Sequence, residues 1–168
     1  MNNQTLNKVL TSNAGAAATV LRIPVGIILA AHGAQKLFGW FGGYGLEGTG
    51  QWMASIGLEP GYLMALLAGG AEFFGGLALI LGLLTRPAAL VSAFTMVVAI
   101  FSVHISNGLF MSNNGYEFAL ALFAATLGLA IQGAGSVSVD NLIANKIAGH
   151  QAETLQHKHS NKHLANQA

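Results

Sequence analysis

The chain of 168 residues lacks cysteine and is poor in both charge and proline. Without cysteine it has no disulfides, thiolate nucleophiles or cysteine metal ligands, so any redox chemistry must use a bound cofactor, a bound substrate or a partner. Asp, Glu, Lys and Arg make up 8% of the residues, against about 25% in soluble domains. A net charge of +1 in so apolar a chain argues against intrinsic disorder and against nucleic-acid binding.

Hydrophobic residues make up 53% of the chain, and the mean hydropathy is +0.56. They gather in four runs close to the length of about 17 to 25 residues that carries a helix across a bilayer. The runs cover about Thr19–Phe38, Tyr62–Leu84, Pro87–Ile105 and Tyr116–Gln132. The alternating pattern of a membrane barrel is absent. The sequence therefore predicts an all-α integral membrane protein, a bundle of four transmembrane helices in contact with the lipid bilayer.

The basic residues predict the orientation of this bundle. Lys8 and Arg22 lie at the start of the first run, Arg86 lies between the second and third, and Lys146 follows the fourth. The opposite loops, 39–61 and 106–115, contain no Lys or Arg, and Lys36 is the one exception near that side. Because basic loops stay on the cytoplasmic side, both termini are expected to be cytoplasmic.

The boundaries of the runs divide the chain into an N-terminal segment 1–18, a membrane domain 19–140 and a polar tail 141–168. The short turn Thr85-Arg86-Pro87 predicts that the second and third helices are antiparallel neighbours. In the first outer loop, Gln51–Ile56 is expected to form a short interfacial helix, with a lid over an outward-facing pocket as the alternative. The tail contains histidines, but we predict no metal site in the chain; these histidines are His150, His157, His159 and His163.

Ionisable side chains inside a bilayer are costly, so each one is a candidate functional residue. In the outer half of the predicted bundle these are His32, Lys36, Glu72, His104 and Glu117. His32 and Glu72 are the candidates for proton handling, since both have protonation states that depend on their surroundings. A structural role is the alternative: Glu72 pairing with a basic residue, and Glu117 capping its own helix.

Three further charged residues, Arg22, Arg86 and Asp140, fall toward the cytoplasmic side. Arg22 and Lys36 are the candidates to hold the carboxylate charges or an anionic ligand, whereas Arg86 and Asp140 are expected to be structural. Aromatic side chains that could contact a flat ligand are Phe38, Trp40, Phe73, Phe74, Phe101 and Phe110.

Several segments in this order resemble the DoxX family of small bacterial inner-membrane proteins, within the DoxD-like superfamily. The segments are Arg22, His32-Gly33-Ala34-Gln35-Lys36-Leu37-Phe38-Gly39, Ala71-Glu72, Gly82-Leu83-Leu84-Thr85-Arg86-Pro87, Glu117 and Gly133-Ala134-Gly135-Ser136-Val137-Ser138-Val139-Asp140. The resemblance covers roughly 19–140, although the usual Gly-Pro-Gly is Gly133-Ala134-Gly135 here. It implies a four-helix membrane domain, a location in the bacterial inner membrane and a link to redox metabolism, since relatives resemble membrane subunits of thiosulfate:quinone oxidoreductases or take part in handling quinones and catechols.

The resulting hypothesis is a membrane protein of redox metabolism that binds a quinone-like or small aromatic ligand in the outer half of the bundle. It leaves open whether the chain is an enzyme or a subunit of a quinone-linked oxidoreductase, with a redox-enzyme partner or a second copy of itself. A small-molecule exporter or permease is one alternative, and a non-catalytic scaffold for a peripheral oxidoreductase is another.

Overall fold

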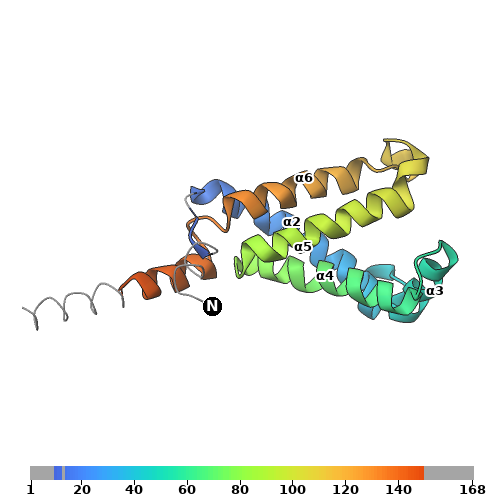
Figure 1. Ribbon diagram of the computed structural model, residues 1–168, viewed down its shortest axis with the longest axis horizontal. Helices are drawn as coiled ribbons and strands as arrows, with labels where there is room; N and C mark the ends of the chain where they lie inside the picture. The colour runs from blue at the N-terminus through green and yellow to red at the C-terminus, as the bar shows by residue number, and fades with distance from the viewer. Residues whose placement is uncertain (1–9, 13, 150–168) are drawn as a thin grey trace, which may run out of the picture.

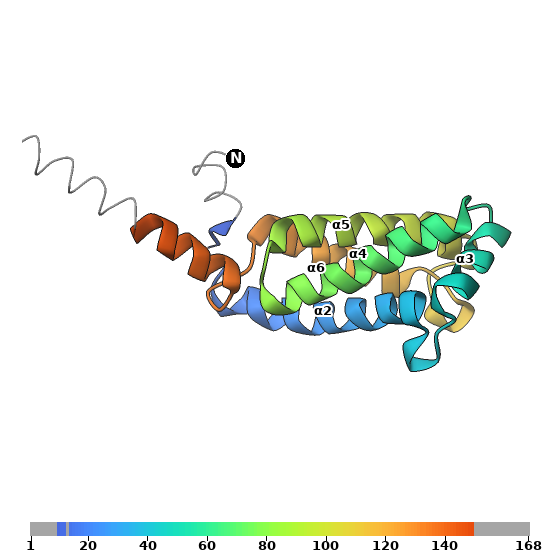
Figure 2. The ribbon, with the colours of Figure 1, turned by 90° about the horizontal axis from the view of Figure 1, so that it is seen from below.

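The computed structural model describes residues 10–12 and 14–149, and helices are the regular structure throughout these ranges. Four long helices lie side by side (Figures 1 and 2). They are α2 (Gly15–Phe38), α4 (Gly61–Leu81), α5 (Thr85–Ala99) and α6 (Glu117–Gln132). The four apolar runs thus correspond to four helices in the predicted order.

Short elements gather at one end of the bundle, which we call the α3 end (Figure 2). They are η1 (Trp40–Gly42), α3 (Gly45–Ser55), the π-helical turn η2 (Ile100–His104), η3 (Ile105–Asn107) and η4 (Met111–Asn113). The short helix expected in the first loop is therefore present, but it begins six residues before Gln51. The opposite end, which we call the Arg22 end, contains the start of α2 and the turn between α4 and α5.

In the described part of the chain, three helical segments are long and apolar enough to cross a membrane: Gly15–Phe38, Gly61–Leu81 and Thr85–Asn107. The helix α6 is apolar but shorter. Large apolar side chains on the outside of the bundle, such as Phe74 and Phe94, are exposed, as expected for a surface that faces lipid.

The turn between α4 and α5 lies three residues earlier than predicted. It consists of residues 82–84, in which Gly82 and Leu84 both have positive φ, and Thr85 is already the first residue of α5. Glycine adopts this left-handed conformation without a Cβ penalty, so α4 ends at Leu81, with Gly82 as its C-cap, rather than at Leu84. Pro87 lies in the first turn of α5, where it costs no hydrogen bond.

The tail begins as a helix, because residues 139–149 continue in helical conformation away from the bundle (Figure 2). The remainder of the tail, with the four histidines named above, and most of the N-terminal segment lie outside the described residues.

Glycines allow α2 and α4 to approach each other closely. A Cβ added to Gly33 would lie 2.3 Å from the backbone nitrogen of Phe73, and one added to Gly76 would lie 2.5 Å from that of Ala30. Because real Cβ atoms do not approach backbone this closely, any larger residue must push the two helices apart. Small residues at such crossings are the usual means of close helix packing in membranes.

Replacing Gly76 by alanine should therefore destabilise the bundle by about 1–3 kcal/mol, the usual cost of overpacking. The matched control is Gly70→Ala in the same helix, where nothing lies within 4 Å of an added Cβ. Thermal unfolding in detergent micelles measures both variants, and equal unfolding temperatures would contradict the proposed backbone contact.

Candidate functional site

A cavity of about 430 Å³, which we call the chamber, lies between the four long helices at the α3 end. Its walls come from α2, α4, the α5–η2 segment and α6, and residues of α3 cover it. The chamber brings together four candidates chosen from the sequence: His32, Lys36, Glu72 and His104. The rest of its lining is mainly apolar, including Leu29, Met53, Met96, Phe118 and Leu122.

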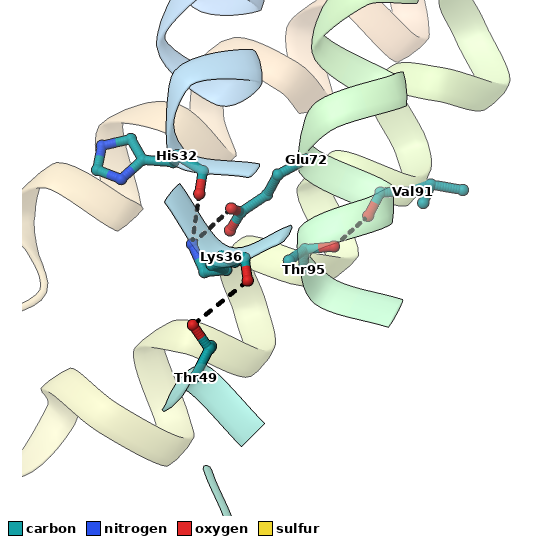
Figure 3. A network of polar contacts seen from close by, with 6 residues as sticks. All are labelled: His32, Lys36, Thr49, Glu72, Val91 and Thr95. Atoms are coloured by element: carbon teal, nitrogen blue, oxygen red, sulfur yellow. Dashed lines mark hydrogen bonds and ion pairs between the residues drawn. The ribbon is translucent and has the colours of Figure 1, made fainter. Parts of the chain in front are cut away.

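Lys36 and Glu72 form an ion pair across the α2–α4 contact (Figure 3). The distance from Lys36 Nζ to Glu72 Oε2 is 2.5 Å, and Nζ also lies 3.5 Å from the backbone oxygen of His32. The Glu72 side chain is 5% exposed and that of Lys36 is 24% exposed. A carboxylate this buried needs its charged partner, since an unpaired charge in an apolar interior is very costly.

The imidazole of His32 points away from this ion pair (Figure 3). It lies instead against Phe118 of α6, with 5.9 Å between the ring centroids and an angle of 51° between the planes. His32 and Glu72, the two residues expected to handle protons, therefore line different parts of the same chamber.

His104 lies at the end of the π-helical turn η2, on the wall formed by the α5 segment. Its Nδ1 is 2.8 Å from the backbone oxygen of Asn114. A carbonyl oxygen only accepts, so Nδ1 donates, and in neutral imidazole the remaining nitrogen, Nε2, is an acceptor. Isolated π-helical turns are frequent at functional sites.

Glu117 contributes to the loop before α6 rather than to the chamber lining. Its Oε1 accepts a hydrogen bond from the backbone N–H of Met111 at 2.6 Å. In the alternative considered from the sequence, Glu117 caps its own helix, but no side chain forms a capping hydrogen bond at the start of α6.

Arg22 lies at the other end of the bundle, where it binds backbone rather than Glu72. Its guanidinium donates to the carbonyls of Leu79 (2.7 Å), Ile80 (2.5 Å), Ala134 (3.1 Å) and Val137. Two of these carbonyls, those of Leu79 and Ile80, lie in the last turn of α4, where a positive charge is favoured by the helix dipole, and the other two follow α6. Of the two basic residues considered as partners for Glu72, Lys36 makes the contact.

Arg86 and Asp140 bind helix ends in the same region. Arg86 donates to the carbonyl of Ala130 at 3.1 Å and to that of Ile131, at the end of α6. The Asp140 carboxylate accepts from the N–H groups of Leu84 (2.7 Å) and Thr85 (2.9 Å), at the start of α5.

The aromatic residues at the chamber differ from those expected. Phe118 and Trp52 line it, whereas Phe74, Phe101 and Phe110 are 63–67% exposed on the outside. Sequence reasoning also missed Ser102 and Asn114. The π-helical turn that contains Ser102 leaves no periodic signal in the sequence. Phe118 could have been found, because it follows the candidate Glu117 directly and lies on the inward face of the predicted fourth helix.

The DoxX family model matches residues 17–105 of the chain. The chain belongs to the DoxX family. This match contains nearly all of α2, all of α3 and α4, and the α5–η2 wall that carries His104, so most of the chamber lies within the family's own segment.

Two curated relatives of this DoxX protein are named as inner-membrane proteins. YqjF of Escherichia coli (strain K12) is 36% identical over 131 residues, which is 73% of this chain and 95% of the relative. YphA of the same organism is 33% identical over 135 residues, which is 75% of this chain and 92% of the relative. CatD of Bacillus subtilis (strain 168) is named as a candidate oxidoreductase. It is 33% identical over 124 residues, which is 74% of this chain and 84% of the relative. No solved structure gives a significant match. The protein is a multi-pass protein of the bacterial inner membrane.

Removing one partner of the ion pair should lower the free energy of unfolding. Removing both partners should lower it by less than the sum of the two single losses. Lys36→Met leaves the buried Glu72 carboxylate unpaired, so we expect a loss of about 3 kcal/mol, near the lower limit for breaking a buried pair. Glu72→Gln should cost less, because the Lys36 ammonium is partly exposed. Unfolding of the two single variants and the double variant gives a double-mutant cycle.

Glu47→Gln is the matched control for this cycle, since Glu47 is exposed in the first turn of α3. Its unfolding temperature should stay close to that of the wild type. Strictly additive effects of Lys36→Met and Glu72→Gln would show that the two side chains do not stabilise each other.

Proposed function

We propose that this DoxX protein takes part in membrane redox metabolism by binding a quinone-like or small aromatic ligand in the chamber. The observation that carries the proposal is the arrangement of the chamber itself: an apolar cavity with the Lys36–Glu72 pair on one wall and His104 on another. Small-molecule sites are typically cavities of about 300–1,000 Å³ with mainly apolar linings and a few polar groups. The chamber volume of about 430 Å³ falls in this range.

The polar groups suit the oxygens of such a ligand. The Lys36 ammonium is a donor for a ring carbonyl, and Nε2 of neutral His104 is an acceptor for a ring hydroxyl. Reduction of a quinone consumes protons, and Glu72 and His32 are the chamber groups that can carry them. The aromatic face of Phe118 and the flexible side chains of Met53 and Met96 supply contacts for the ring.

The source of electrons in this proposal is a partner. The chain contains no cysteine, so it has no thiol of its own to oxidise. A relative named as a candidate oxidoreductase supports a role beside redox enzymes, as a subunit or as a scaffold. A permease is less well supported, because Leu79 and Leu129, both fully buried, fill the bundle core toward the Arg22 end.

The proposal includes a fourth membrane span and a cytoplasmic location for both termini. The 16 residues of α6 rise about 24 Å, which covers most of a hydrocarbon core of about 30 Å. With α6 as a span, Arg22, Arg86 and Lys146 all lie on one side, as the positive-inside rule requires.

Quinones should raise the unfolding temperature of the wild type, because a ligand that binds only the folded state stabilises it. The shift should be lost or strongly reduced in His32→Ala and Glu72→Gln and should be retained in the exposed control Glu47→Gln. Thermal unfolding in detergent with a short-chain ubiquinone or menaquinone analogue measures it. Absence of a shift with any quinone in folded wild-type protein would disprove the proposed ligand class.

Single cysteines test the topology directly, since the natural chain has none. Asn113→Cys, in η4 at the α3 end, should react with a membrane-impermeant maleimide added to spheroplasts. Lys146→Cys, in the exposed part of the helical segment 139–149, should react only after the membrane is opened. The reverse pattern would contradict the proposed orientation, and reaction of both in intact spheroplasts would contradict the fourth span.

A further inference from the structure

A second cavity, of about 530 Å³, adjoins the chamber at the α3 end. It lies between the last turn of α2, the segment around η1 and the α3 helix. Its lining includes Gln35, Lys36, Tyr44, Gly48, Thr49 and Trp52. Two of these residues, Lys36 and Trp52, also line the chamber, so they stand between the two cavities.

The second cavity offers hydrogen-bond partners to water. It is bordered by an amide, an ammonium, a hydroxyl, a phenol and glycine backbone. A roomy cavity bordered by such groups can hold water.

The position of the second cavity also favours water. Lys36 is two residues from the end of α2 at Phe38, which corresponds to about 3 Å along the helix axis. Tyr44 and Trp52 border the cavity, and Tyr and Trp are typical of the boundary between lipid and water. The cavity therefore lies at the level where a membrane helix meets the aqueous phase.

The ion pair is asymmetric between the two cavities. The Lys36 side chain keeps 24% of its surface exposed, but that of Glu72 keeps only 5%. The backbone oxygen of Lys36 lies 3.5 Å from Thr49 Oγ1 (Figure 3), and Thr49 lines the second cavity. Lys36 is thus the more exposed partner of the ion pair, and it lines both cavities.

We infer that the second cavity is a water-filled vestibule that connects the Lys36–Glu72 ion pair to the aqueous phase at the α3 end, and that Trp52 separates this water from the chamber. Protons then reach the ion pair from the vestibule, while an apolar ligand occupies the chamber without meeting bulk water. The inference concerns water access alone, so it holds or fails independently of which ligand the chamber binds.

Cysteine labelling in the naturally cysteine-free chain tests the vestibule. Thr49→Cys should react with a cationic, membrane-impermeant methanethiosulfonate reagent in detergent-free proteoliposomes, although Thr49 is only 6% exposed. The control is Phe74→Cys in α4, where the native side chain is 65% exposed but faces the outside of the bundle. A lipid-facing thiol is shielded from water and should remain unlabelled. Gly48→Cys is a second vestibule variant in case Thr49→Cys fails to fold.

Ser102→Cys tests the separation, because Ser102 lines the chamber but not the vestibule. Moving the charged reagent into an apolar cavity costs free energy, so this thiol should react at least about tenfold more slowly than Thr49→Cys. Adding Trp52→Ala should raise the rate for Ser102→Cys toward that for Thr49→Cys.

The vestibule is disproved if neither Thr49→Cys nor Gly48→Cys reacts in folded protein. The role of Trp52 is disproved if Ser102→Cys reacts as fast as Thr49→Cys while Trp52 is present, or if Trp52→Ala leaves its rate unchanged. Because no quinone is needed for labelling, a failed thermal-shift experiment would leave these results intact.

Discussion

The close contact between the backbones of α2 and α4 is the constraint on which the chamber depends. Gly33 and Gly76 leave no room for even a methyl group between the helices. Lys36 lies one turn beyond Gly33 on α2, and Glu72 lies one turn before Gly76 on α4. Their charged groups meet at 2.5 Å because the helices that carry them are this close. The ion pair is therefore a product of the packing as well as a stabilising contact within it.

The two ends of the bundle use charge differently. At the Arg22 end, Arg22, Arg86 and Asp140 bind backbone groups at helix ends, which bulk lipid cannot satisfy. At the α3 end, the charged groups of Lys36 and Glu72 bind each other beside a cavity, and His104 lines the opposite wall. Charged side chains that form hydrogen bonds with backbone groups hold the helices together. Charged side chains beside a cavity remain available to a ligand. This difference locates the candidate site at the α3 end.

The sequence predicted the helices well because each apolar run is long, and the lipid requirement leaves little choice of structure. Charges are rare in such runs, so the sequence singled out His32, Lys36, Glu72 and His104, which the structure brings to one cavity, but it did not predict which of them meet. The choice of Lys36 over Arg22 as the partner of Glu72 depends on the position of each residue along the α2–α4 contact. The position of His104 depends on a π-helical turn, and the aromatic lining depends on helix rotation, neither of which composition reveals.

The contacts of Asp140 affect the order in which the bundle is completed. Asp140 lies after the last long helix, yet it binds the start of α5, and two of the four carbonyls bound by Arg22, those of Ala134 and Val137, also follow α6. During synthesis from the N-terminus, these groups leave the ribosome after all four helices. These contacts can therefore form only after the last long helix has been made, and a chain that stopped at Gln132 would have every long helix but would lack the contacts of Asp140 with α5 and of Arg22 with Ala134 and Val137.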